Sequence, residues 1–160
     1  MNMKNSAWKT YVFWILVSEA VGLLAGLLIR DGTQIYAETI IKPPLAPPQW
    51  VFPAVWAILY ALMGISAARV SLSLPSPQRS LGLNLMVTQL IVNFFWPLLF
   101  FNAQAFGFAL MWLILLWVLV LLMILAYRNV DPLAAWLQVP YLLWLTFALY
   151  LNAAVWYLNR

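Results

Sequence analysis

Residues Lys42–Tyr60 read KPPLAPPQWVFPAVWAILY and join two different kinds of chain. The first half holds four closely spaced prolines, and proline neither donates a backbone hydrogen bond nor fits a helix interior or a central strand. We therefore expect Lys42–Gln49, here called the strap, to be a stiff, extended connection of polyproline type. The second half is apolar and aromatic, and it predicts the start of a long helix.

The rest of the chain, outward from this stretch, is strongly apolar. It has 160 residues, of which 66% are hydrophobic and 8% charged, whereas a soluble domain averages about 25% charged residues. Five apolar runs stand out, at residues 10–29, 51–70, 81–101, 106–127 and 133–157. Each is long enough to cross about 30 Å of hydrocarbon as a helix, and none has the alternating pattern of a barrel strand. The sequence predicts one domain, 1–160, that is an all-α integral membrane protein: a five-transmembrane-helix bundle with a Pro-rich loop between helices 1 and 2.

The charged residues flank the apolar runs, and their distribution predicts the orientation. The side that carries the N terminus has five basic residues, and the other side has three. These are Lys4, Lys9, Arg69, Arg79 and Arg128 on the first side, and Arg30, Lys42 and Arg160 on the second. Because cytoplasmic loops are enriched in basic residues, we expect a cytoplasmic N terminus, with the strap and the C terminus outside.

Several classes of chemistry lack the residues that they need. The chain has no Cys and no His, and its four carboxylates are spread over three separate regions. Thiol and Ser-His catalysis and the usual zinc, iron and copper sites are therefore unexpected, and we expect no metal and no cofactor. The basic pI of about 9.6 comes from scattered charges. Without a basic cluster, no nucleic-acid partner is expected.

Three predicted helix faces combine aromatic, amide and small side chains at helical spacing. They are Pro53, Trp56, Tyr60 and Gly64 on the second span, Gln89, Asn93, Trp96 and Phe100 on the third, and Tyr141, Trp144, Ala148 and Asn152 on the fifth. Unpaired amides are costly in a membrane, so these faces should point into the bundle. They could line a pocket for a planar hydrophobic ligand, or they could bond the helices together; periodicity does not separate the two.

Other residues of the spans leave alternatives open. Glu19 lies inside the first span, where a carboxyl group costs about 2.5–3.5 kcal/mol; it could contact a ligand or be protonated and bonded between helices. Gly22 and Gly26 form a pair that allows close packing, either within the bundle or between two copies. Pro97 and Pro140 fall inside two spans and predict kinks.

The end of the fifth span fits a loose sterol-contact pattern through Val155, Tyr157 and Arg160. A helix end anchored at the membrane interface explains the same three residues equally well.

Three segments together resemble the TspO/MBR family, the tryptophan-rich sensory proteins related to the translocator protein (peripheral-type benzodiazepine receptor). They are KPPLAPPQWVFPAVW at Lys42–Trp56, LIVNFFWPLLF at Leu90–Phe100 and VPYLLWLTFALYLN at Val139–Asn152. The resemblance implies a five-helix bundle in a bacterial cell membrane, usually a homodimer. It also implies binding of porphyrins such as protoporphyrin IX, and of sterols in some members.

The resemblance also assigns site residues. It places the ligand pocket on Trp56, Asn93, Trp96, Trp144 and Ala148, with Tyr36 and Pro47 closing over it. Two functions are then compatible with the chain. The first is a membrane receptor, sensor or transporter that binds porphyrin-like or other planar hydrophobic ligands inside the bundle. The alternative is an enzyme that degrades porphyrin under light and uses Trp56 and Trp144. We favour the first because it needs only the pocket, and we leave catalysis open.

Overall fold

The structure, a computed structural model, describes residues 3–160, with side chains from Ala7 onward. The long helices are α1 (Met3–Leu28), α3 (Val51–Leu72), α4 (Pro77–Pro97), α5 (Phe106–Arg128) and α7 (Val139–Leu158). The short elements are α2 (Arg30–Thr39), the π-helical turn η1 (Leu98–Asn102) and α6 (Pro132–Trp136). Lys4, which counts toward the charge asymmetry, lies outside the described side chains.

Five segments are long and apolar enough to cross a membrane. They are Ala7–Leu28, Val51–Leu72, Pro77–Asn102, Phe106–Arg128 and Pro132–Leu158. From residue 3 to residue 160 the secondary structure is helical, without a strand. Helices satisfy their backbone groups internally, as hydrocarbon requires. The predicted fold class, an all-α membrane protein with five spans, is therefore confirmed.

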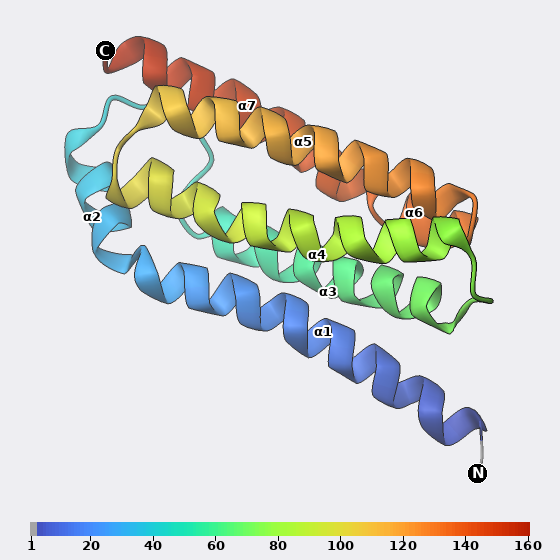
Figure 1. Ribbon diagram of the computed structural model, residues 1–160. Coiled ribbons are helices and arrows are strands. Elements are labelled where there is room, and N and C mark those ends of the chain that lie inside the picture. Colours follow the sequence, from blue (N-terminus) through green and yellow to red (C-terminus); the bar gives the residue numbers. More distant parts are fainter. Residues whose placement is uncertain (1–2) are drawn as a thin grey trace.

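The helices form a bundle in which α5 packs along both α4 and α7, and α1 packs mainly along α3 (Figure 1). One face of α5, at Leu113, Leu116, Val120 and Met123, is fully buried. This spacing is that of a single helix face turned toward the core. Helix α1 stays at the edge of the bundle, so that much of its apolar surface faces the bilayer.

The segment 30–49, expected to be a long loop, differs from that expectation in its first half. It forms α2, which lies across one end of the bundle (Figure 1). A glycine at position 32 allows the close approach, because a Cβ on Gly32 would come within 2.8 Å of the Phe101 carbonyl oxygen. The ring of Tyr36 packs on Phe100 and Phe101, at 5.5 and 5.3 Å between centroids. These contacts stabilise a polar helix that a count of apolar runs does not reveal.

The strap contains no helix or strand, as expected, but it is bent. The amide of Ala46 donates to the carbonyl of Pro43 at 3.3 Å, and Leu45 inside this turn has a φ of 67°. That left-handed conformation lies outside the polyproline region. The prediction of one extended polyproline segment is therefore wrong at Leu45.

The two prolines expected to kink their helices act differently. Pro97 is the last residue of α4, and the chain continues as η1, where the amide of Ala103 donates to the carbonyl of Leu98 at 3.0 Å. Pro140 instead lies in the first turn of α7, where a helix needs no N–H. The fifth span is divided before Pro140, into α6 and α7.

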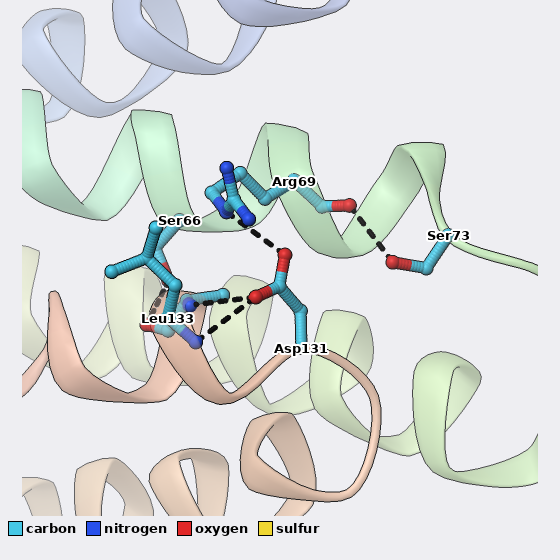
Figure 2. Close-up of polar contacts among 6 residues, drawn as sticks. Ser66, Arg69, Ser73, Asp131 and Leu133 are labelled. Atoms are coloured by element: carbon cyan, nitrogen blue, oxygen red, sulfur yellow. Dashed lines mark hydrogen bonds and ion pairs between the residues drawn. The ribbon is translucent and has the colours of Figure 1, made fainter.

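One side chain joins the start of α6 to α3. Oδ2 of Asp131 lies 2.8 Å from Nε of Arg69, and Oδ1 accepts hydrogen bonds from the amides of Leu133 and Ala134 (Figure 2). Asp131 is therefore both the N-cap of α6 and half of an ion pair. Burial raises the pKa of Asp131, but the hydrogen bonds from Arg69 and the two amides outweigh it and hold the pKa below its usual range.

Two further contacts extend this junction along the same face of α3. Ser66 donates from Oγ to the carbonyl of Ala134 at 2.7 Å, and Gln138 donates from Nε2 to the carbonyl of Leu62 at 3.3 Å. We call these residues the polar clamp: Leu62, Ser66 and Arg69 on α3, with Asp131, Ala134 and Gln138 at and beside α6. The polar clamp fastens the beginning of the fifth span to α3.

Candidate functional site

The ring of Trp56 on α3 lies half-buried between two tyrosines. Its centroid is 5.5 Å from that of Tyr60 and 6.1 Å from that of Tyr141 on α7. Tyr60 accepts a hydrogen bond from Asn93 on α4 at 3.1 Å, and Tyr141 donates one to Oε1 of Gln89 at 2.9 Å. The structure therefore connects the predicted faces of α3, α4 and α7 around these two phenols.

Trp96 on α4, one helical turn after Asn93, is also buried. It donates from Nε1 to Oδ1 of Asn152 on α7 at 3.2 Å, and Asn152 donates to the carbonyl of Phe106 at 2.8 Å. The indole stacks on Phe100 with 5.3 Å between centroids. Ala148, one turn before Asn152, is buried as well. These contacts tie α4, α5 and α7 together.

The three predicted faces thus meet inside the bundle, and the two predicted amides of α4, Gln89 and Asn93, are buried there. Each of them hydrogen bonds to a tyrosine of another helix, as the bonding interpretation predicts. A cavity lies beside this network, between α3 and α7.

This cavity, which we call the α3–α7 groove, has a volume of about 460 Å³. Its lining is apolar throughout and consists of Val55, Ile58, Leu59 and Leu62 on α3 and Pro140, Leu143, Trp144 and Phe147 on α7. The volume falls within the range of small-molecule sites, about 300–1,000 Å³. The α3–α7 groove can therefore hold an apolar molecule or part of one.

Trp144 is the predicted site residue that lines the α3–α7 groove. Its ring centroid lies 5.9 Å from that of Phe52 and 5.7 Å from that of Phe147. Trp56 does not line the groove, but it adjoins the lining residue Val55 in sequence and contacts α7 through Tyr141. The aliphatic lining was missed in the sequence, because aliphatic residues at helical spacing are equally typical of any surface that faces lipid.

Tyr36 reaches the same interior from the end of the bundle that carries α2. Its ring packs on Phe100, which in turn stacks on Trp96. Burial raises the pKa of the Tyr36 phenol. Tyr36 therefore lies over the Trp96 end of the interior network.

Directed hydrogen bonds attach the strap and the residue before it, Ile41, to the C-terminal end of α7 and its C-cap. Asn159 accepts from the amide of Ile41 and donates to its carbonyl, both at 3.0 Å. Tyr150 donates from its hydroxyl to the carbonyl of Pro44, also at 3.0 Å. Pro47 is half-buried in the strap. Sequence reasoning missed Asn159 and Tyr150, which lie more than 100 residues from their partners.

The three residues of the loose sterol-contact pattern do not share one surface. Val155 is fully buried in the core, whereas Tyr157 is exposed. The guanidinium of Arg160 lies 4.3 Å from the centroid of the Tyr157 ring. The exposed part of the pattern is therefore a cation–π pair at the end of α7.

The two glycines of α1 have different environments. A Cβ on Gly22 would overlap the ring of Tyr60, whereas a Cβ on Gly26 would meet nothing within 4 Å. Gly22 thus serves close packing within the bundle, and Gly26 lies on an open flank. Glu19, seven residues before Gly26 and so on the same side of the helix, is half-buried.

Comparison with known proteins places this bundle in a family. The sequence pattern that defines the TspO/MBR family matches residues 14–158, which include all the helices of the site just described. The chain belongs to the TspO/MBR family. The resemblance noted in the three sequence segments is thereby confirmed.

Relatives of this TspO/MBR protein come from bacteria and from animals. It is 36% identical to the tryptophan-rich protein TspO of Chlorobaculum tepidum over 156 residues, which cover 97% of this chain and 99% of the relative. It is 40% identical to protein CrtK of Rhodobacter capsulatus, with 84% and 83% covered. It is 36% identical to the translocator protein of Ovis aries, with 96% and 92% covered. The similarity thus extends over most of each protein.

Proposed function

We propose that this TspO/MBR protein is a membrane receptor, sensor or transporter for a planar, porphyrin-like ligand. The observation that carries the proposal is the position of Trp144, which the family resemblance assigns to the ligand and which lines the apolar α3–α7 groove. Flat aromatic rings and an apolar wall are suited to a flat hydrophobic molecule.

The proposed site extends inward from Trp144. It comprises Trp56, Asn93, Trp96, Trp144 and Ala148, with Tyr36 and Pro47 at its closed end. Support comes from the contacts among these residues: Trp56 and Asn93 both contact Tyr60, and Tyr36 reaches Trp96 through one ring. A bound ligand would replace some of these ring contacts with its own.

A titration tests the proposal with the intact protein in lipid nanodiscs of phosphatidylcholine and phosphatidylglycerol. Protoporphyrin IX should quench tryptophan fluorescence to saturation. Trp144→Ala should weaken its affinity about tenfold, equivalent to about 1.4 kcal/mol. Trp117→Ala is the matched control, because Trp117 bonds Thr146 outside the site. Absence of saturable quenching in the wild type would refute the porphyrin proposal.

The same samples test the light-dependent alternative. Binding alone leaves the Soret absorption band of protoporphyrin IX intact in light and in darkness. Loss of the band under light that requires both Trp56 and Trp144 would favour the degrading enzyme instead.

The proposed orientation has the N terminus in the cytoplasm, in a bacterial cell membrane. The α3–α4 connection and the end of α5 lie at the end of the bundle that carries the start of α1, whereas α2 lies at the other end (Figure 1). Arg69, Arg79 and Arg128 belong to the first set of elements, and Arg30 begins α2, with Lys42 shortly after it. This distribution agrees with the positive-inside rule. A C-terminal phosphatase fusion, which is active only outside the cytoplasm, should be active; an inactive fusion together with an active cytoplasmic reporter would reverse the orientation.

We also propose that the protein is a homodimer, as the resemblance implies. Support comes from α1, where Leu16 and Leu23 are exposed and the backbone at Gly26 is open to close approach. Sedimentation of the wild type in detergent should give twice the mass of the chain. The Gly26→Leu variant should sediment with the mass of a single chain.

A further inference from the structure

The two helices that line the α3–α7 groove are joined at one end and separated along the rest. At the joined end the polar clamp connects α3 to α6 and to Gln138. Beyond Leu62 the backbones of α3 and α7 make few close approaches, and side chains such as Phe52 and Trp144 bridge the space. The α3–α7 groove occupies this diverging part.

The α3–α7 groove opens toward the bilayer. Ile58 on its α3 wall is 62% exposed, and Leu143 on its α7 wall is 65% exposed. Both residues lie in the middle of apolar spans, so the solvent at this opening is hydrocarbon. Aromatic rings gather at the α7 wall, where the Trp144 ring packs on Phe147, another lining residue, and on Phe52 of α3.

The end of the bundle that carries α2 (Figure 1) is closed in a different way. There Tyr150 of α7 bonds to Pro44 of the strap, and two hydrogen bonds join Asn159, just after α7, to Ile41, just before the strap. Opening this end requires directed polar bonds to break together. The ring contacts of Trp144 with Phe52 and Phe147 beside the α3–α7 groove are apolar, so rotation of these partly exposed rings breaks no hydrogen bond between their side chains. Such rotations take nanoseconds or less for exposed side chains.

We propose that a planar apolar ligand dissolved in the bilayer enters and leaves this protein sideways, through the α3–α7 groove. This inference rests on the proposed function. Trp144 is the residue at which the route and the proposed site meet, because it belongs to both. The strap is then a fixed wall that keeps water out, and the polar clamp sets how far α3 and α7 can separate.

The absence of cysteine from the chain makes the route testable by labelling at one position. Leu143→Cys places a thiol at the opening, where a bulky apolar maleimide would obstruct passage. Ile58→Cys does the same from the opposite wall, and it also replaces the first variant if that variant does not fold. Ile114→Cys, labelled identically, is the control, because Ile114 is 49% exposed on α5 and away from the groove.

Stopped-flow quenching of tryptophan by protoporphyrin IX in nanodiscs gives both rate constants, and equilibrium quenching gives Kd. An obstructed route slows association and dissociation equally and leaves Kd unchanged. We expect both rates to fall about tenfold in labelled Leu143→Cys and Ile58→Cys, a barrier increase of about 1.4 kcal/mol. Labelled Ile114→Cys should match the wild type.

Other outcomes separate this inference from the proposed function. Normal Kd with normal rates at both labelled positions would mean that the ligand takes another route, and the inference would be wrong while the function stands. A weakened Kd with unchanged association would make the groove itself the binding site, which also overturns the inference. No quenching in any protein would overturn the proposed function and the inference with it.

Discussion

Arg69 and Asp131 form an ion pair between α3 and the start of α6, with 2.8 Å between Nε and Oδ2. The same carboxylate accepts two backbone amides of α6 through its other oxygen. One side chain thus fixes both the beginning of α6 and its distance from α3. Since the Asp131 side chain is only 16% exposed, water can replace its partners only in part.

Removal of this carboxylate should destabilise the protein in two separable steps. Asp131→Asn keeps an N-cap oxygen but loses the charge, so it should cost about 1 kcal/mol. Asp131→Ala loses the cap as well and should cost about 2 kcal/mol. Thermal unfolding in detergent micelles measures both variants. Equal midpoints for Asp131→Asn and the wild type would show that the ion pair adds nothing.

The same group predicts a response to acid. Because the pKa of Asp131 is lower in the folded protein than its ordinary value of about 3.9, its contribution is complete above about pH 4. It is lost as the pH falls through the folded-state pKa. The unfolding midpoint should therefore fall more steeply below about pH 4 in the wild type than in Asp131→Asn. Parallel curves would contradict this prediction.

The two glycines of α1 form a matched pair for a packing test. Gly22→Ala places a methyl group into the ring of Tyr60, and such overpacking costs about 1–3 kcal/mol. Gly26→Ala meets nothing within 4 Å in its own chain, so in detergent that separates the proposed dimer into single chains it should stabilise the helix by up to about 1 kcal/mol. Unfolding midpoints that shift in opposite directions are expected. A shift of Gly22→Ala to higher temperature would show that α1 moves away from α3 at little cost.

The interior phenols hold the amides of α4. Tyr60→Phe removes the acceptor of Asn93, and Tyr141→Phe removes the donor to Gln89. Each leaves a buried polar group unpaired, which costs about 1–3 kcal/mol. Tyr150→Phe is the control, because the carbonyl of Pro44 that it releases lies at an exposed position. Tyr150→Phe should lower the unfolding midpoint less than either interior variant.

Hydrogen exchange reports on the attachment of the strap. The amide of Ile41 is bonded to Oδ1 of Asn159, so it should exchange slowly in the wild type and about tenfold faster in Asn159→Ala, equivalent to about 1.4 kcal/mol of local opening. Amides inside α5 should be unaffected. An unchanged rate at Ile41 would mean that the strap is held by its own turn.

The sequence was sufficient for the spans and for the faces that meet inside the bundle. The length of the apolar runs predicts the spans. The helical spacing of Gln89, Asn93 and Trp96 predicts which face of α4 points into the bundle. It was insufficient for α2, because that helix is polar and its docking depends on Gly32 lying against Phe101. The turn at Leu45 could not be predicted either. A high proline content indicates an extended chain, and it does not indicate that one residue adopts a left-handed conformation.

The site itself was only partly predictable. Family resemblance drew attention to Trp144, which indeed borders a cavity. Nothing in the sequence distinguishes Ile58 or Leu143 from other aliphatic residues that face lipid. The groove exists because the polar clamp joins α3 to α6 at one end only, and that asymmetry arises from pairs such as Ser66 and Ala134, 68 residues apart.

The bond between Ile41 and Asn159 joins positions separated by 118 residues. The ribosome makes the strap after the first span and before the other four. Domains generally fold from the N terminus onward. The strap must therefore wait, untethered, until the last helix has been inserted and its far end has reached the membrane surface. Its closure would be a late event in biogenesis and would mark a chain whose insertion is complete.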